Sequence, residues 1–373
     1  MTAPSPDLPT APAPPGPPVT PSSPRRRWPV VVAVVVAAAL LIGLLGAIIR
    51  LPYVIYSPGD ATPVEGIVKV SGARTYRSRG EVLFLTVSVS TERPNVWRWV
   101  QASLDSDSDV VGENSFLQGQ SRSRVEKENV AAMTDSQSAA KKVALEQLGY
   151  TVTESGNGAI VVQVVKGSPA SGHLEEGDVI TAIDGAPIRL AEQVGTIVRA
   201  RPVGTTFDFT VTRKGATRSE KVTTAAAKSG PLKGKPQVGI VPVTKDLKFD
   251  YPVDITIDPG PVSGPSAGLA FTLTIIDELT PGSLTGAQKV AVTGTMDLDG
   301  NVGEVGGVTQ KTAAALDAGA KLFIVPKAEV KDARARAGSK ATVIGVSTID
   351  GALRALREHG GAPVPKTPAA AAA

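Results

Sequence analysis

The distribution of apolar residues divides this chain of 373 residues into segments of different character. Residues 1–27 are rich in Pro, Ala, Ser and Thr and hold too little apolar surface for a core, so we predict a disordered tail. Residues 30–49 form an unbroken apolar run of about the 20 residues that cross a bilayer as a helix. The pattern therefore predicts a membrane-spanning helix over residues 28–50. A cleaved signal peptide is the alternative, although its apolar core should be shorter.

The charges beside this apolar run predict its orientation. Three arginines, Arg25 to Arg27, precede the run, whereas only Arg50 follows it closely. The positive-inside rule then places the N-terminus in the cytoplasm and everything after Arg50 outside it. Trp28 at one end and Tyr53 at the other fit the aromatic anchors of the two membrane interfaces. We expect a single-pass membrane protein with a large extracytoplasmic part.

The middle of the chain has the pattern of a small, strand-rich domain. Short runs of Val, Ile and Thr alternate with glycine turns between residues 158 and 215, around one helical stretch at 191–200. Three short motifs within it, Gly167 to Ala170, Gly177 to Ile180 and Ile183 to Gly185, resemble those of a bacterial PDZ domain. The resemblance covers residues 150–228 and implies that this domain captures peptide C-termini by strand addition.

The position of the carboxylate-binding loop in this domain is open. Gly149, Tyr150 and Thr151 follow Leu148 where such domains often carry that loop, so we take them as candidate peptide-binding residues. The same residues also fit the end of the preceding helix.

A serine stands at an unusually stiff position in "GPVSGPSAGLAFTL", residues 260–273. Gly264 and Pro265 suit the start of a helix whose buried face carries Leu269 and Leu273. Ser266 then lies at the positive end of that helix, among backbone N–H groups that suit an oxyanion. The segment is either a plain turn before a helix or the mounting of a nucleophile.

A lysine follows on a second predicted helix. Residues 290–295 and 322–325 read as buried strands, and residues 309–318 as a helix that stops at Gly319. Lys311 shares one face of this helix with Ala314, Ala315 and Ala318. Burial on that face would lower its pKa and make it a usable base. The alternative is a lysine that extends to water from the first turn.

Three motifs in this half resemble the proteolytic domain of Lon-type proteases. They are "GPSAG" at 264–268, "VTG" at 292–294 and "GGVTQK" at 306–311, in matching order and at similar separations. The resemblance implies that Ser266 is the nucleophile, that Lys311 is its general base and that Thr293 orients the lysine. Ser263 departs from the family, because many Lon domains carry an acidic residue there.

The resemblance extends to segments before the PDZ-like region. "GEVLFLTVSV" at 80–89 and the helical stretch 131–149 are similar to the first strand and first helix of the same protease domain. The protease domain is then split into residues 64–149 and 236–355, with a disordered tail over 360–373. The expected fold is α+β: a transmembrane helix, then a mixed α/β Lon-type domain with an inserted β-rich PDZ domain, the layout of a bacterial family that residues 28–352 resemble.

Composition limits the chemistry. The chain has no cysteine and only two histidines, His173 and His359, which are not in a metal-ligand spacing, so we expect no metal or cofactor. The net charge of +4 is spread out and no basic run is interleaved with aromatics, which argues against nucleic acid as a partner. No G-x-x-x-x-G-K-[ST] phosphate loop occurs in the sequence.

Two functions are consistent with these features. The first is a membrane-anchored, ATP-independent serine endopeptidase whose PDZ domain binds substrate or partner peptides. The second is an adaptor of the cell envelope in which catalysis has lapsed and the PDZ domain alone acts. Lon-type domains often form rings, so a homo-oligomer is possible in either case, but no residue pattern establishes one.

Overall fold

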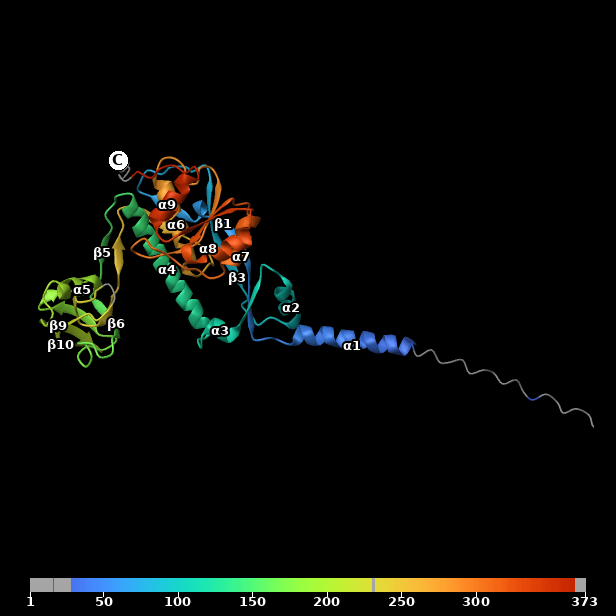
Figure 1. The fold of residues 1–373 in the computed structure, drawn as a ribbon, viewed down its shortest axis with the longest axis horizontal. Coiled ribbons are helices and arrows are strands. Elements are labelled where there is room, and N and C mark those ends of the chain that lie inside the picture. The colour runs from blue at the N-terminus through green and yellow to red at the C-terminus, as the bar shows by residue number, and fades with distance from the viewer. Residues whose placement is uncertain (1–15, 17–27, 230–231, 366–373) are drawn as a thin grey trace, which may run out of the picture.

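The computed structural model describes residue 16, residues 28–229 and residues 232–365. The rest of the predicted N-terminal tail and residues 366–373 of the predicted C-terminal tail lie outside the described residues. Helix α1 (Trp28–Ile48) projects away from the folded part of the molecule, as Figure 1 shows. Within the described residues it is the one helix long and apolar enough to cross a membrane.

A mixed six-stranded sheet forms the centre of the larger folded region. Its strand order is β20-β19-β16-β3-β1-β4, with the four strands from β20 to β3 parallel and β1 antiparallel to both of its neighbours. The bounds are β1 (Tyr53–Pro63), β3 (Glu81–Val89), β4 (Asp109–Gly112), β16 (Lys289–Val292), β19 (Leu322–Pro326) and β20 (Thr342–Val346).

Helices cover both faces of this sheet. Helices α4 (Arg122–Gln147), α6 (Gly268–Leu279) and α9 (Ile349–Glu358) pack on one face, and α7 (Val308–Asp317) and α8 (Val330–Ala337) on the other. The strands alternate accordingly, since Phe84 points to the first core and Leu83 and Leu85 to the second. The predicted strand at 80–89 and helix at 309–318 are therefore present within a residue at each end, whereas the helix predicted at 131–149 begins earlier, at Arg122.

The larger folded region extends beyond the predicted limits at both ends of the chain. Strand β1 begins at Tyr53, ahead of the boundary predicted at residue 64, and its register shifts between Pro58 and Ala61, which obscured the strand pattern. At the other end composition predicts a tail from residue 360. Ala362 nevertheless donates a backbone hydrogen bond to Ser283 (2.8 Å), and Val364 packs on the core.

A second, antiparallel sheet forms the smaller folded region. Its order is β10-β9-β7-β6-β13, with helix α5 (Ala191–Arg199) packed against it. The strands are β6 (Ala159–Val164), β7 (Val179–Ile183), β9 (Thr206–Arg213), β10 (Ala216–Thr223) and β13 (Ile240–Thr244). Strand β13 lies past the predicted limit of this region at residue 228, because Pro242 interrupts its apolar pattern.

The two regions are joined by a two-stranded connection. Strand β5 (Thr153–Ser155) leaves the end of α4 and pairs with β14 (Lys248–Asp250), which returns the chain to the large sheet (Figure 1). The remaining elements are α2 (Val96–Leu104), α3 (Glu113–Leu117), β2 (Val68–Ser71), β8 (Ala186–Pro187), β11 (Ala225–Ala226), β12 (Pro236–Gln237), β15 (Asp254–Ile257), β17 (Thr295–Met296), β18 (Val302–Gly303) and the short 3₁₀ helices η1 (Val64–Gly66), η2 (Pro265–Ala267) and η3 (Lys327–Glu329). The smaller region is thus inserted between two segments that both contribute strands to the large sheet.

Candidate active site

Ser266 lies in the 3₁₀ turn η2, which runs directly into helix α6. The residue is half-buried, and its hydroxyl has no hydrogen-bond partner among the described residues. The first two amides of α6, on Gly268 and Leu269, donate to the carbonyl oxygens of Pro265 and Gly294, and the helix dipole adds positive potential at this end of the helix. The turn therefore presents a hydroxyl beside groups that favour negative charge.

Helix α4 holds this turn in place. Ser136 Oγ donates a hydrogen bond to the carbonyl oxygen of Pro265 (2.8 Å), and the amide of Gly264 donates to the carbonyl oxygen of Asn129 (3.2 Å). The approach is so close that a Cβ atom on Gly268 would lie 2.3 Å from Ser136 Oγ and 2.9 Å from the backbone nitrogen of Met296. Glycine is required here because a side chain would push the turn away from α4 and β17.

Thr293 connects the serine turn to the large sheet. It directly follows β16, at the carboxyl end of a parallel strand, where sites in α/β sheets commonly form. The carbonyl oxygen of Ser266 accepts hydrogen bonds from the amide of Gly294 (2.9 Å) and from Thr293 Oγ1 (3.3 Å). The structure thus joins the first two of the three motifs.

Lys311 reaches the same point from the opposite face of the sheet. It lies in the second turn of α7, and its Nζ donates a hydrogen bond to Thr293 Oγ1 (3.1 Å). The residue is only 3% exposed, so it does not extend to water as the alternative interpretation required. Burial lowers the pKa of Lys311 to about 8, against the opposing effect of the Glu329 carboxylate. A substantial fraction is therefore a neutral amine near physiological pH.

Glu329 is a neighbour of this lysine that sequence reasoning missed. Its Oε1 accepts a hydrogen bond from the amide of Val305 (2.6 Å), while its Oε2 is buried with no partner among the described residues. Burial raises the pKa of Glu329, and the charge of Lys311 lowers it. No sequence signal distinguished Glu329 from an ordinary acidic residue in the first turn of a helix.

The structure brings the candidate peptide-binding residues to the end of α4. Gly149 and Tyr150 donate backbone hydrogen bonds to the carbonyl oxygens of Glu146 and Leu145, both at 3.0 Å, and Tyr150 packs on the core of the large sheet. This is a helix C-terminal cap with Gly149 in a left-handed conformation. The helix-end interpretation thus describes where these residues lie.

Strand β13 is the feature of the smaller region that sequence reasoning missed. It forms one edge of the antiparallel sheet and contacts α5. Just before it, the carbonyl oxygens of Val238 and Gly239 accept hydrogen bonds from the amides of Ala170 and Val165, both at 2.9 Å. The amides of Val238 and Gly239 have no acceptor among the described residues. "VGI" at 238–240 is the sequence signal that could have directed attention here.

Comparison with known proteins matches two different families to two segments of the chain. Residues 243–356 match the Lon protease (S16) C-terminal proteolytic domain, and residues 147–224 match the PDZ domain. The Lon protease of Rickettsia bellii is 37% identical over 109 residues, which cover 28% of this chain and 14% of the relative. The archaeal Lon protease of Archaeoglobus fulgidus is 38% identical over 101 residues, covering 26% of this chain and 16% of the relative.

A solved structure is similar to the smaller region. The PDZ domain of the SdrC-like protein from Listeria monocytogenes is 26% identical over a match that covers 23% of this chain and 88% of that structure, with a TM-score of 0.22.

The chain therefore carries a Lon-type proteolytic domain of mixed α/β structure and a PDZ domain, behind an N-terminal apolar helix that is a candidate membrane span. The chain matches 14% and 16% of the length of the two Lon proteases named above.

Proposed function

We propose that this chain is a membrane-anchored, ATP-independent serine endopeptidase in which Ser266 and Lys311 form the catalytic dyad. The observation that carries the proposal is the buried Lys311, whose Nζ donates a hydrogen bond to Thr293 Oγ1. The same hydroxyl donates to the backbone carbonyl oxygen of Ser266, so Thr293 connects the two residues. A lysine buried with no acidic hydrogen-bond partner among the described residues costs free energy, so its presence favours a chemical role.

The acylation step follows from these groups. The neutral Lys311 Nζ accepts the proton of the Ser266 hydroxyl while Oγ attacks the carbonyl carbon of the scissile peptide bond. The positive end of the α6 helix dipole stabilises the oxyanion that forms. The Lys311 ammonium then returns its proton to the leaving amine, so the C–N bond breaks and an ester to Ser266 remains.

Deacylation uses the same base. A water molecule gives its proton to Lys311 Nζ and attacks the ester carbonyl, and the ammonium then protonates Ser266 Oγ as it leaves. Thr293 is a positioning residue in both steps, because its hydroxyl fixes the direction of the amine. Glu329 acts through charge alone and favours the ammonium form.

The anchor and the independence from ATP rest on different observations. Helix α1 has the length and composition of a span, and the arginines before it favour a cytoplasmic N-terminus with the protease outside. The printed sequence contains no phosphate loop, so we assign no ATP-driven step to it. Protease added to intact spheroplasts should digest the large domain; protection would reverse the orientation.

The PDZ domain would bind peptides at the edge of β13. An extended peptide can add a strand there, between β13 and α5, with its terminal carboxylate on the amides of Val238 and Gly239. The candidate residues Gly149, Tyr150 and Thr151 stay a weaker proposal for the same role.

An activity-based probe tests the dyad. A fluorophosphonate or peptidyl boronate should label the full chain in detergent and should not label Ser266→Ala. Ser138→Ala is a matched control, since Ser138 is a half-buried serine on helix α4 whose hydroxyl donates a hydrogen bond to the carbonyl oxygen of Thr134 (3.0 Å). Equal labelling of wild type and Ser266→Ala, or none of either, would favour the adaptor function.

A further inference from the structure

Helix α2 is fixed beside the point where α1 ends. The amide of Leu51 donates a hydrogen bond to the carbonyl oxygen of Pro94 (2.9 Å), and Arg50 and Asn95 form an isolated β-bridge. Asn95 caps α2, because its side chain accepts a hydrogen bond from the amide of Arg98 (2.8 Å). Figure 1 shows α2 next to the end of α1 that meets the folded region. The first turn of α2 therefore lies beside the C-terminal end of α1.

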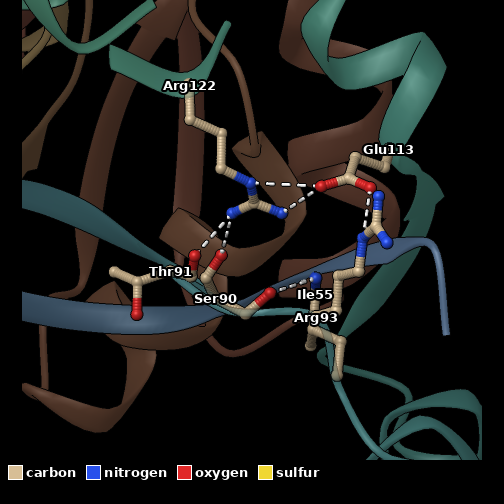
Figure 2. Close-up of polar contacts among 6 residues, drawn as sticks. All are labelled: Ile55, Ser90, Thr91, Arg93, Glu113 and Arg122. Carbon is tan, nitrogen blue, oxygen red and sulfur yellow. Dashed lines mark hydrogen bonds and ion pairs between the residues drawn. The ribbon is translucent and has the colours of Figure 1, made fainter. Parts of the chain in front are cut away.

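A cluster of charged residues fastens this junction to the protease domain. The buried Glu113 carboxylate accepts hydrogen bonds from Arg93 Nε (2.7 Å) and from Arg122 Nη2 (2.9 Å). A second nitrogen of Arg122 donates to the carbonyl oxygens of Ser90 (3.1 Å) and Thr91 (2.7 Å), at the end of β3 (Figure 2). The loop that leads into α2 is thus tied to both the sheet and the start of α4.

Trp97 of α2 contacts the apolar helix α1 several residues before that helix ends. Its Nε1 donates a hydrogen bond to the carbonyl oxygen of Gly43 (2.9 Å), and a Cβ atom on Gly46 would lie 2.6 Å from that nitrogen. Gly43 lies about 8 Å from the Ile48 end of the helix, at 1.5 Å rise per residue. If α1 is embedded as far as Ile48, the indole of Trp97 must lie in the lipid too. Tryptophan with a satisfied N–H is favoured at that depth.

The outward face of α2 continues this apolar surface. Trp97, Val100 and Leu104 follow the i, i+3, i+7 spacing, with Trp97 46% and Leu104 83% exposed. The opposite side packs inward, where Ala102 is buried and the Trp99 ring lies 6.0 Å from the Tyr53 ring. One apolar side of this nine-residue helix packs on the protein, so its outward side needs another apolar surface to cover it. The bilayer that α1 enters lies directly beside that outward side.

We propose that α2 is a membrane-surface helix that inserts Trp97, Val100 and Leu104 into the outer interfacial layer of the bilayer. This inference rests on the proposed membrane span of α1. Its consequence is that the protease domain has one fixed orientation at the membrane, because α2 and α1 form two attachment points instead of one. The exposed Arg98 lies beside this apolar face, where a cation suits anionic lipid headgroups.

Single-cysteine spin labelling tests the inference on the full chain, because the chain has no cysteine of its own. The variants are Leu104→Cys on α2, Val36→Cys in the middle of α1 and Val203→Cys in the PDZ domain, all at exposed positions. Each is labelled with a nitroxide in vesicles of phosphatidylcholine and phosphatidylglycerol, and its collision rates with oxygen and with a water-soluble nickel chelate are compared.

We expect the oxygen-to-nickel ratio to be highest at Val36, several-fold lower but clearly lipid-like at Leu104, and water-like at Val203. A lipid-like Val36 with a water-like Leu104 would overturn the role of α2 and leave the span intact. A water-like Val36 would overturn the span and the inference with it. Spin–spin broadening at Leu104 that disappears on dilution with unlabelled chain, without a lipid-like ratio, would show that a second copy covers α2.

Discussion

Thr293 Oγ1 lies between the two proposed reacting residues, accepting a hydrogen bond from Lys311 Nζ at 3.1 Å and donating one to the carbonyl oxygen of Ser266 at 3.3 Å. One hydroxyl thus couples the lysine of α7 to the serine turn before α6, across the end of β16. The hydroxyl that positions the base is neutral, so no described residue that hydrogen-bonds the amine stabilises its ammonium form as a carboxylate would.

Activity should therefore rise with pH through an apparent pKa near 8, because Lys311 must lose its proton before it can activate Ser266. Lys311→Arg keeps the charge but cannot deprotonate in this range, so it should be as inactive as Lys311→Ala. Thr293→Ala should be milder, losing roughly 1 to 3 kcal/mol of transition-state stabilisation. Peptide hydrolysis from pH 6 to 10 measures all three. Near wild-type turnover by Lys311→Arg would show that the lysine is structural.

The same burial predicts a gain in stability when the lysine is removed. The pKa of folded Lys311 is below its unfolded value, so the unfolded chain binds the proton more tightly and the lysine destabilises the fold at neutral pH. Lys311→Met should raise the free energy of unfolding by up to about 3 kcal/mol at pH 7, taking 1.36 kcal/mol per pKa unit. The gain should shrink as pH rises above 8 and vanish above the unfolded pKa. Exposed Lys331→Met is the control and should change little.

Glu329→Gln should move the pH profile without destroying the site. The amide oxygen of glutamine can still accept the hydrogen bond from Val305, so the local structure is kept. Loss of the negative charge lowers the pKa of Lys311 further, so the rising limb of activity should shift to lower pH. Glu358→Gln, an exposed carboxylate on α9, should leave the limb in place. A fall in turnover at an unchanged pKa would assign Glu329 a purely structural role.

Ser136→Ala should lower turnover more than stability. The substitution removes the donor to the Pro265 carbonyl oxygen and loosens the turn that carries Ser266. A lost hydrogen bond of this kind costs about 1 to 2 kcal/mol, and a small displacement of a nucleophile reduces its rate further. Hydrolysis rates and urea denaturation should be measured beside Ser138→Ala on the same helix. If the two variants behave alike, the contact from α4 does not position the serine.

The sequence predicted which residues of the site lie together better than it predicted the limits of the two folded regions. The resemblance of three motifs to the Lon-type domain grouped Ser266, Thr293 and Lys311, and hydrogen bonds join the three residues in the structure. Glu329 could not be found, because its effect on Lys311 depends on how η3 folds back toward α7, and no local pattern encodes that. Strand β13 was missed for a related reason, since its pairing with β6 joins residues far apart in the chain and Pro242 weakens its strand pattern.

The location of peptide binding can be resolved by observing the backbone directly. Because the amides of Val238 and Gly239 have no acceptor in the part of the chain that the structure describes, a peptide ending in a free carboxylate should shift their ¹⁵N–¹H resonances. The amides of Gly149 and Tyr150 are already bonded within the cap of α4, so they should not shift. Selective ¹⁵N-glycine, ¹⁵N-valine and ¹⁵N-tyrosine labelling of the full chain in detergent makes these signals observable.

The same peptide with an amidated C-terminus is the control and should bind more weakly, because it lacks the charge that the amides stabilise. Shifts at Gly149 and Tyr150 with none at Val238 and Gly239 would move the carboxylate site to the end of α4 and reject the β13 edge.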